Sequence, residues 1–313
     1  MGDLERAVDT VVGRCLGVRD GEELVVVVDP EGVDLGNALL EGGLRAGADA
    51  VLAVLPPRPA RGTEPPDPIA AAMAAADVYI APAAPSLSHT VARKTATEKG
   101  IRGATMPGAT ADLVARLMSV DFDALAARCK AVADLLSASD EARVTCPRGT
   151  DMRFDLRGRT GIPDDGDLTA PGAFGNLPCG EGFIAPAGGE GTIVTNSLAM
   201  IGLADEPVRI EVTDGSLSDA SGADGERLVE LLTGHGDAGR NLAELGVGTN
   251  DRAKMTGNVL EDEKILGTIH VAFGASAAIG GTVTVPVHID VVVVDPTLHI
   301  GDTIVVDAGR FAL

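Results

Sequence analysis

Short aliphatic runs alternate with stretches of helical spacing throughout residues 1–140. The first run, LVVVV at residues 24–28, has no polar position, which is typical of a parallel strand covered on both faces. Helical spacing precedes this run and follows it over residues 35–46. Such alternation predicts an open, mostly parallel α/β sheet, interrupted only by a Pro-rich linker over residues 56–68. The turn after the first run reads DPEGVDLGN, without the GxGxxG fingerprint, so no dinucleotide is expected.

The pattern changes near residue 140. Strand patterns become more frequent beyond this point, and the turns become rich in Gly and Asp, as in IPDDGD. We therefore expect two domains: an α/β domain over residues 1–140 and a strand-rich α+β domain, which carries the metal site argued below, over residues 141–313.

Charge and composition narrow the range of partners. The formal net charge is −21 and no basic run interrupts it, which excludes nucleic acid and anionic membranes as principal partners. No apolar run approaches the roughly 20 residues of a membrane span, and the first residues, MGDLERAVDT, lack the pattern of a secretory signal. The four cysteines are far apart and form no CxxC pair. We expect a cytoplasmic protein with reduced thiols and a small-molecule or small-peptide partner.

The clearest chemical signal lies in VTVPVHIDVVVV, residues 283–294. On a strand, His288 and Asp290 project from the same face, about 7 Å apart along the chain. A carboxylate on an otherwise aliphatic strand is costly without a partner, and a cation is one such partner. The alternatives are a hydrogen bond between the two side chains, or a strand edge open to water.

A second strand pattern, ILGTIHVAF, places His270 on the face opposite Ile269 and Val271. Taken alone, such a histidine is more often a satisfied core residue. His288 and Asp290 follow it at a hairpin-like distance, and two histidines with one carboxylate form a facial metal site with open positions.

Two glutamates could extend this site. Glu244 lies in the buried-looking segment NLAELGVG, where its pattern fits a ligand and a surface residue equally well. Glu181 lies in a Gly-rich turn and, from its pattern alone, is more typical of a surface residue. The run EDEK at residues 261–264 is typical of a solvated turn or helix start, with Glu263 as a candidate outer acceptor.

Several segments together resemble a known family, the aminopeptidase T and aminopeptidase S metallopeptidases. They are KGIRGATMPGAT, GTDMRFDLRGR, NLPCGEGFIAP, NLAELGVGTN, GNVLEDEKILGTIHVAFG and VHID, in that order along most of the chain. The resemblance implies an α/β N-terminal domain, a metal-bearing C-terminal domain and a homodimer. It also implies five ligands for two divalent ions, here Glu181, Glu244, His270, His288 and Asp290.

The sequence departs from this family at one position that matters for catalysis. The peptidases carry a catalytic Tyr seven residues after the histidine that matches His270, and here that position is Ala277. A phenol that would stabilise a tetrahedral intermediate is therefore missing from its expected place.

Three functions remain open. Because both glutamates are present, the preferred interpretation is a metal-dependent, aminopeptidase-like hydrolase that uses Zn, Co or Mn. Metal-activated water would attack a peptide or amide bond, and Glu181, a ligand or a base, would orient that water. The alternative is a mononuclear Fe(II) dioxygenase, like the related dihydroxypyridine dioxygenases, that opens a dihydroxypyridine-like ring with His270, His288 and Asp290 as its triad. The third is a non-catalytic or biosynthetic binding protein.

Overall fold

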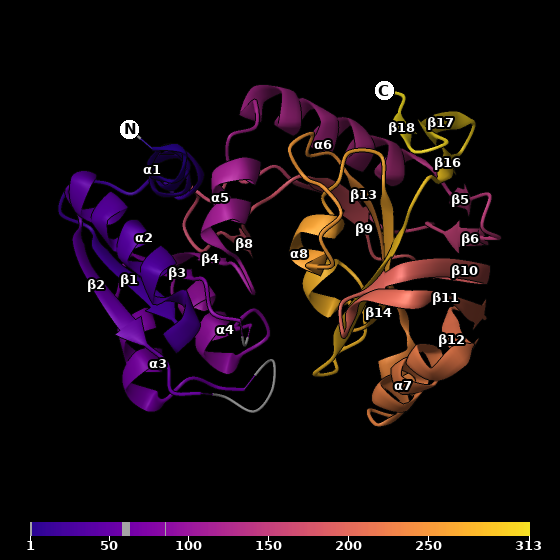
Figure 1. Cartoon of the computed structure of the whole chain (residues 1–313), viewed down its shortest axis with the longest axis horizontal. Coiled ribbons are helices and arrows are strands. Elements are labelled where there is room, and N and C mark those ends of the chain that lie inside the picture. Colours follow the sequence, from indigo (N-terminus) through magenta and orange to yellow (C-terminus); the bar gives the residue numbers. More distant parts are fainter. Residues whose placement is uncertain (1, 58–62, 85) are drawn as a thin grey trace. The chain divides into compact units, whose positions relative to one another are not determined.

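The chain forms two compact units, shown in Figure 1. The computed structural model describes residues 2–57, 63–84 and 86–313, so residues 58–62 of the predicted linker lie outside the described part. Unit 1 comprises residues 1–120 and 166–179, and unit 2 comprises residues 121–165 and 180–313. The division differs from the predicted boundary at residue 140, because the last long helix of the first half groups with unit 2 and a later segment returns to unit 1.

Unit 1 is built on the open parallel sheet that the alternation predicts. Its strand order is β2-β1-β3-β4-β8, and every neighbouring pair is parallel. The strands are β1 (Glu23–Val28), β2 (Asp49–Val54), β3 (Val78–Ala81), β4 (Arg102–Thr105) and β8 (Phe174–Asn176). The last of these comes from the part of the sequence assigned to the second domain, because residues 166–179 add a strand to the far edge of the sheet.

The helices of unit 1 follow the predicted alternation. They are α1 (Asp3–Asp9), continued by a π-helical turn over Thr10–Cys15, α2 (Val33–Arg45), α3 (Asp67–Met73), α4 (Val91–Glu98) and α5 (Ala111–Leu117). Helix α4 begins where the side chain of Thr90 accepts a hydrogen bond from Arg93 N, and the chain turns away at Gly100, whose φ is +84°. On strand β1, every residue except Glu23 is buried. The aliphatic run of the sequence thus lies inside the unit.

Unit 2 contains a large antiparallel sheet with the path β18-β17-β16-β5-β6-β10-β15-β14-β13-β9-β7 in the described residues, to which β11 and β12 are attached through β10. The strands are β5 (Glu141–Thr145), β6 (Asp151–Asp155), β7 (Ile162–Asp164), β9 (Glu181–Ile184), β10 (Gly188–Leu198), β11 (Gly202–Thr213), β12 (Ser216–Ala220), β13 (Leu242–Gly248), β14 (Ile269–Gly274), β15 (His288–Val293), β16 (Thr297–Ile300), β17 (Thr303–Asp307) and β18 (Arg310–Phe311). The helices are α6 (Phe122–Ala138), α7 (Gly222–Thr233) and α8 (Val259–Asp262). Helix α6 packs on β7 and β9, which explains why it belongs to unit 2.

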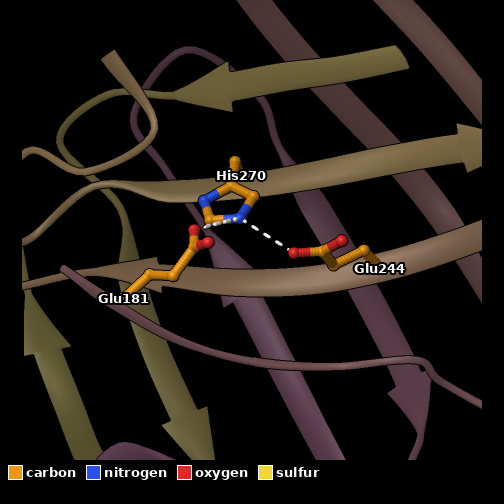
Figure 2. Close-up of side chains that lie close together, drawn as sticks. All are labelled: Glu181, Glu244 and His270. Carbon is orange, nitrogen blue, oxygen red and sulfur yellow. Dashed lines mark hydrogen bonds and ion pairs between the residues drawn. The ribbon is translucent and has the colours of Figure 1, made fainter. Parts of the chain in front are cut away.

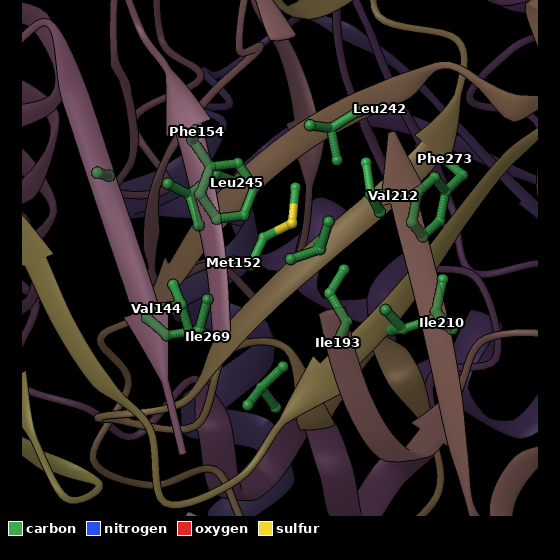
Figure 3. Packing of buried hydrophobic residues seen from close by; sticks show 14 of the residues in the cluster. Val144, Met152, Phe154, Ile193, Ile210, Val212, Leu242, Leu245, Ile269 and Phe273 are labelled. Carbon is green, nitrogen blue, oxygen red and sulfur yellow. The ribbon is translucent and has the colours of Figure 1, made fainter. Parts of the chain in front are cut away.

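Strands β13, β14 and β15 separate two kinds of side chain onto their two faces. Leu245, Ile269 and Phe273 point into the aliphatic core of unit 2, as Figure 3 shows. Fully burying such a side chain stabilises a protein by about 1.5–3 kcal/mol. Because side chains alternate along a strand, this apolar face fixes which residues point the other way. The polar residues of the same strands lie on that opposite face.

Strand β15 is shorter than the sequence pattern predicts. It begins at His288, and the expected strand residues 283–287 form the end of a loop instead. The backbone N–H groups of Ser276 and Ala277 both donate to the carbonyl of Val283, which closes this loop on itself. Pro286 also disfavours strand pairing in this segment, since it has no N–H to donate to a neighbouring strand.

Among the described residues, no helix combines the length and the apolarity that crossing a membrane requires.

Candidate metal centre

The strand register of unit 2 brings the predicted site residues together. Asp290 on β15 pairs with Ala272 on β14, and Ala272 pairs with Glu244 on β13, so the two carboxylates stand on either side of a small residue. His288 lies two residues before Asp290 and shares its face, as the alternation predicted. Glu181 is the first residue of the neighbouring strand β9. Four adjacent strands thus contribute to one polar cluster.

His270 lies across the backbone of the next strand. It pairs with Gly246 on β13, and a Cβ atom at Gly246 would lie only 1.9 Å from His270 Nε2 and 2.1 Å from Cε1. No side chain larger than hydrogen fits there without moving the ring. Gly246 therefore permits the imidazole to reach the carboxylates on either side of it.

One half of the cluster, here called the inner group, consists of Glu181, Glu244 and His270 (Figure 2). His270 Nε2 lies 3.0 Å from Glu181 Oε2 and 3.3 Å from Glu244 Oε1. The three side chains are at least nine-tenths buried. Both carboxylates point toward the imidazole from neighbouring strands.

The other half, the outer group, consists of Glu244, His288 and Asp290. His288 Nε2 lies 3.3 Å from Glu244 Oε2 and 3.4 Å from Asp290 Oδ1. The opposite ring nitrogen, Nδ1, donates to the carbonyl of Ala275 at 2.8 Å. Such a bond fixes the orientation of the ring and keeps Nε2 available as a ligand atom, as is common for metal-binding histidines. Glu244 belongs to both groups and lies between the two imidazoles.

These donor atoms fit a divalent cation. Ligand atoms about 2.1 Å from one ion lie about 3.0–3.4 Å from one another in octahedral or tetrahedral arrangements, and the four distances above fall in this range. Glu181 Oε2 has the 3.0 Å ion-pair contact with His270 Nε2, but within the described part of the chain neither this oxygen nor His270 Nδ1 has a hydrogen-bond partner. Burying a carboxylate oxygen that no hydrogen-bond donor contacts costs free energy, unless a positive charge lies next to it. The cluster could therefore hold a divalent metal ion.

Without a metal ion, the histidines carry the charge that balances the glutamates. Burial alone would lower the pKa of His270, but Glu181 and Glu244 raise it well above 6.5. Burial likewise opposes protonation of His288, but Asp290 and Glu244 raise its pKa well above 6.5. Burial would raise the pKa of Glu244, yet the hydrogen bonds from both histidines hold it at about 2. An incoming cation therefore competes with protons for this site.

A buried lysine, which the sequence analysis did not single out, neighbours the inner group. Lys264 Nζ lies 2.6 Å from Glu181 Oε1, 2.9 Å from Glu263 Oε1 and 3.7 Å from Asp164 Oδ2, and its side chain is 1% exposed. Burial raises the pKa of Glu263 to about 7 and that of Asp164 to about 8, although Lys264 opposes both shifts.

The prediction that EDEK is a solvated turn is wrong, because all four residues are buried. The run is not a helix start either, because helix α8 begins at Val259 and ends within the run at Asp262. Glu261 accepts from the backbone N–H of Lys254, and Asp262 accepts from those of Thr256 and Gly257. The carboxylates of Glu261 and Asp262 thus find hydrogen-bond donors inside the protein. The signal of burial in the sequence was the pair of aliphatic residues on each side of the run, VL before it and IL after it.

Access to the cluster is unequal. The side chains of His288 and Asp290 are 16% and 17% exposed, whereas that of His270 is 1% exposed. Ala277, which occupies the position of the peptidase Tyr, is exposed in a short 3-10 turn after β14. A substrate would therefore approach the outer group first.

Comparison with known proteins identifies the family. Residues 15–313 match the family model of 2,5-dihydroxypyridine 5,6-dioxygenase (NicX). The chain belongs to this family. No curated protein matches the sequence. The family match thus supports the alternative of the sequence analysis, a dihydroxypyridine dioxygenase, better than its preferred interpretation, an aminopeptidase-like hydrolase.

Two solved structures share the fold of the whole chain. The 2,5-dihydroxypyridine dioxygenase from Pseudomonas putida KT2440 is 19% identical with a TM-score of 0.83, over 100% of this chain and 98% of that one. Wild-type AmpT from Thermus thermophilus is 18% identical with a TM-score of 0.70, over 99% of each chain. At these identities the likeness concerns the fold, so the chemistry must be argued from the site itself.

Proposed function

We propose that this protein is a metal-dependent dioxygenase that opens the ring of a dihydroxypyridine-like aromatic compound. The observation that carries the proposal is the family match over residues 15–313. It is supported by the absence of a phenol at Ala277, which a peptidase of this fold would use, and by the partly exposed outer group.

The side chains of the outer group would hold one divalent ion. Glu244, His288 and Asp290 offer one imidazole and two carboxylates, and three protein ligands leave coordination positions open for a substrate. Sequence reasoning had combined both histidines with Asp290, but Glu244 lies between the two imidazoles. We therefore assign Glu244 as the third ligand and His270 as the residue that orients it. When bound, a redox-active ion such as Fe(II) would supply Lewis acidity and electron transfer to oxygen.

The protein's own groups would prepare the reaction. The bond from His288 Nδ1 to the carbonyl of Ala275 keeps Nε2 directed into the site. His270, buried between two glutamates, would donate from Nε2 to Glu244 and so orient that carboxylate. The apolar strand face beneath the cluster excludes water from its inner side, which strengthens every charge interaction within it.

One observation favours a second function, a two-metal hydrolase. Glu244 contacts both imidazoles, one through each oxygen, and so joins the inner and outer groups as a bridging carboxylate between two ions would. Two ions could together activate water and polarise a carbonyl.

The two functions differ in what they consume. The protein would be loaded anaerobically with Fe(II), Zn or Co, and assayed for oxygen uptake with 2,5-dihydroxypyridine and for release of amino acids from short peptides. The proposal predicts oxygen uptake with Fe(II) that Asp290→Asn abolishes. Peptide hydrolysis without oxygen uptake would refute it.

A further inference from the structure

Arg93, on helix α4 of unit 1, is a buried cation without an anionic partner. Only 8% of the residue is exposed. Its Nε donates to the carbonyl of Ser88 at 2.7 Å, and its guanidinium lies 4.5 Å from the centre of the Phe174 ring. In the part of the chain that the structure describes, no carboxylate pairs with Arg93, and no acceptor contacts its two terminal nitrogens. Burying a charge in this way is costly, because folding removes water without supplying a counter-ion.

The neighbouring Tyr79 does not supply the missing negative charge. Burial raises the pKa of Tyr79 well above its ordinary value of 10, although Arg93 opposes the shift, so the phenol stays neutral. Tyr79 on β3 pairs with Gly103 on β4, which pairs with Phe174 on β8, and the Tyr79 ring lies across Gly103. Its hydroxyl is buried and has no hydrogen-bond partner among the described residues. A phenol and a guanidinium that lie close together thus both lack an acceptor.

A third donor, the amide of Asn176, lies on the same side of the sheet. Asn176 follows Phe174 by two residues on β8, so the two side chains share one face. Its Oδ1 accepts from Thr105 Oγ1 at 2.6 Å and from Ser88 Oγ at 3.3 Å. These two contacts direct the amide oxygen toward the hydroxyls and leave Nδ2 to donate elsewhere. Ser88 therefore joins Arg93, through its carbonyl, to Asn176, through its hydroxyl.

The position of these donors is one where open α/β sheets bind ligands. Thr105 and Asn176 are the last residues of the parallel strands β4 and β8. Ligands of such sheets bind outside the carboxyl ends of the strands. The donors lie at or near that edge of unit 1, and none of them belongs to the metal cluster.

The chemistry of the donors selects a carboxylate. The Nε of Arg93 is occupied, which leaves the two terminal nitrogens to present parallel N–H groups that match the two oxygens of a carboxylate. A single cation balances one negative charge, whereas a phosphate brings up to two. The backbone N–H groups of Val91 and Ala92, at the start of α4, already donate to Glu64 and cannot hold a phosphate.

We propose that Arg93, Tyr79 and Asn176 form a binding site in unit 1 for the carboxylate group of a small molecule. The guanidinium holds both carboxylate oxygens, and the phenol and the amide donate to them. This inference uses no residue of the metal cluster and does not depend on the proposed dioxygenase activity.

Calorimetric titration of the full-length chain, stripped of metal, with benzoate tests the proposal. Benzamide, which has the same shape without the charge, and inorganic phosphate are titrated alongside. The variants are Arg93→Gln and Tyr79→Phe. Lys94→Gln is the matched control, because it removes the same charge from the next, exposed residue of α4. Asp290→Asn reveals any binding of benzoate to the metal cluster.

The wild-type chain should bind about one benzoate, and benzamide and phosphate at least about tenfold more weakly. Arg93→Gln should weaken benzoate binding at least about tenfold, since it removes a charge-assisted, bidentate contact. Tyr79→Phe should weaken it about threefold to tenfold, because one hydrogen bond is lost. Lys94→Gln and Asp290→Asn should bind benzoate as the wild-type chain does.

The proposal is overturned if the wild-type chain does not bind benzoate, or binds benzamide or phosphate as tightly. Unchanged affinity in folded Arg93→Gln, or loss of binding in Asp290→Asn, would also overturn it. If Arg93→Gln does not fold, Tyr79→Phe and crystals of the wild-type chain soaked in 4-bromobenzoate decide. An anomalous bromine peak beside Arg93 and Phe174 supports the site, and a peak elsewhere or none contradicts it.

Discussion

Replacing Gly246 with alanine tests how the strand register builds the centre. The new methyl group would start 1.9 Å from His270 Nε2, so the ring must move by about 1.5 Å to restore ordinary contact. Overpacking of this kind costs about 1–3 kcal/mol of stability. The shift also separates His270 from Glu244, and loss of such an orienting contact weakens metal binding about 10–100-fold. Urea unfolding and calorimetric titration with Co²⁺ measure the two effects.

Gly103→Ala is the matched control for this change. Gly103 on β4 lies across the ring of Tyr79 in unit 1, and a Cβ there would lie 2.0 Å from Tyr79 Cε1. This substitution should cost similar stability without changing the affinity for metal. The reasoning is refuted if Gly246→Ala binds Co²⁺ as tightly as the wild-type chain, or if Gly103→Ala loses affinity to the same extent.

Three further predictions concern residues of unit 2. Because the pKa of His288 is raised well above 6.5, metal binding at neutral pH should release at least about one proton, and affinity should fall as the pH falls; titrations in buffers of different ionisation enthalpy that show no proton release would contradict this. His288→Ala should lower metal affinity at least about tenfold more than His270→Ala, since His270 acts through Glu244, and equal losses by calorimetry would count against Glu244 as the third ligand. Asp262→Ala should destabilise the protein by about 3 kcal/mol, because backbone donors of residues 256 and 257 lose a buried carboxylate, and a change below about 1 kcal/mol in urea unfolding would be inconsistent with that role.

Local patterns in the sequence were sufficient for the elements that carry the site. The aliphatic run of β1 predicted a parallel sheet, and the alternation around His288 and His270 predicted a shared polar face. Both predictions were possible because the face on which a strand residue lies depends only on its position relative to its neighbours in the sequence. Glu244 was correctly placed in a buried segment.

The remaining features depend on residues that are distant in sequence. Four consecutive charges at residues 261–264 looked solvated, and only Glu181 and Asp164, from strands about 80 to 100 residues earlier, show why Lys264 can be buried. The role of Gly246 is visible only once β13 and β14 are paired in register. The return of residues 166–179 to unit 1 has no local signal, because β8 has only three residues.

Anomalous diffraction from crystals of the Fe(II)-loaded protein, grown without oxygen, tests the central claim most directly. The account predicts a single strong peak bounded by Glu244 Oε2, His288 Nε2 and an oxygen of Asp290, with Lys264 still paired to Glu181. A peak outside this cluster, or no peak in protein that elemental analysis shows to contain iron, would contradict it.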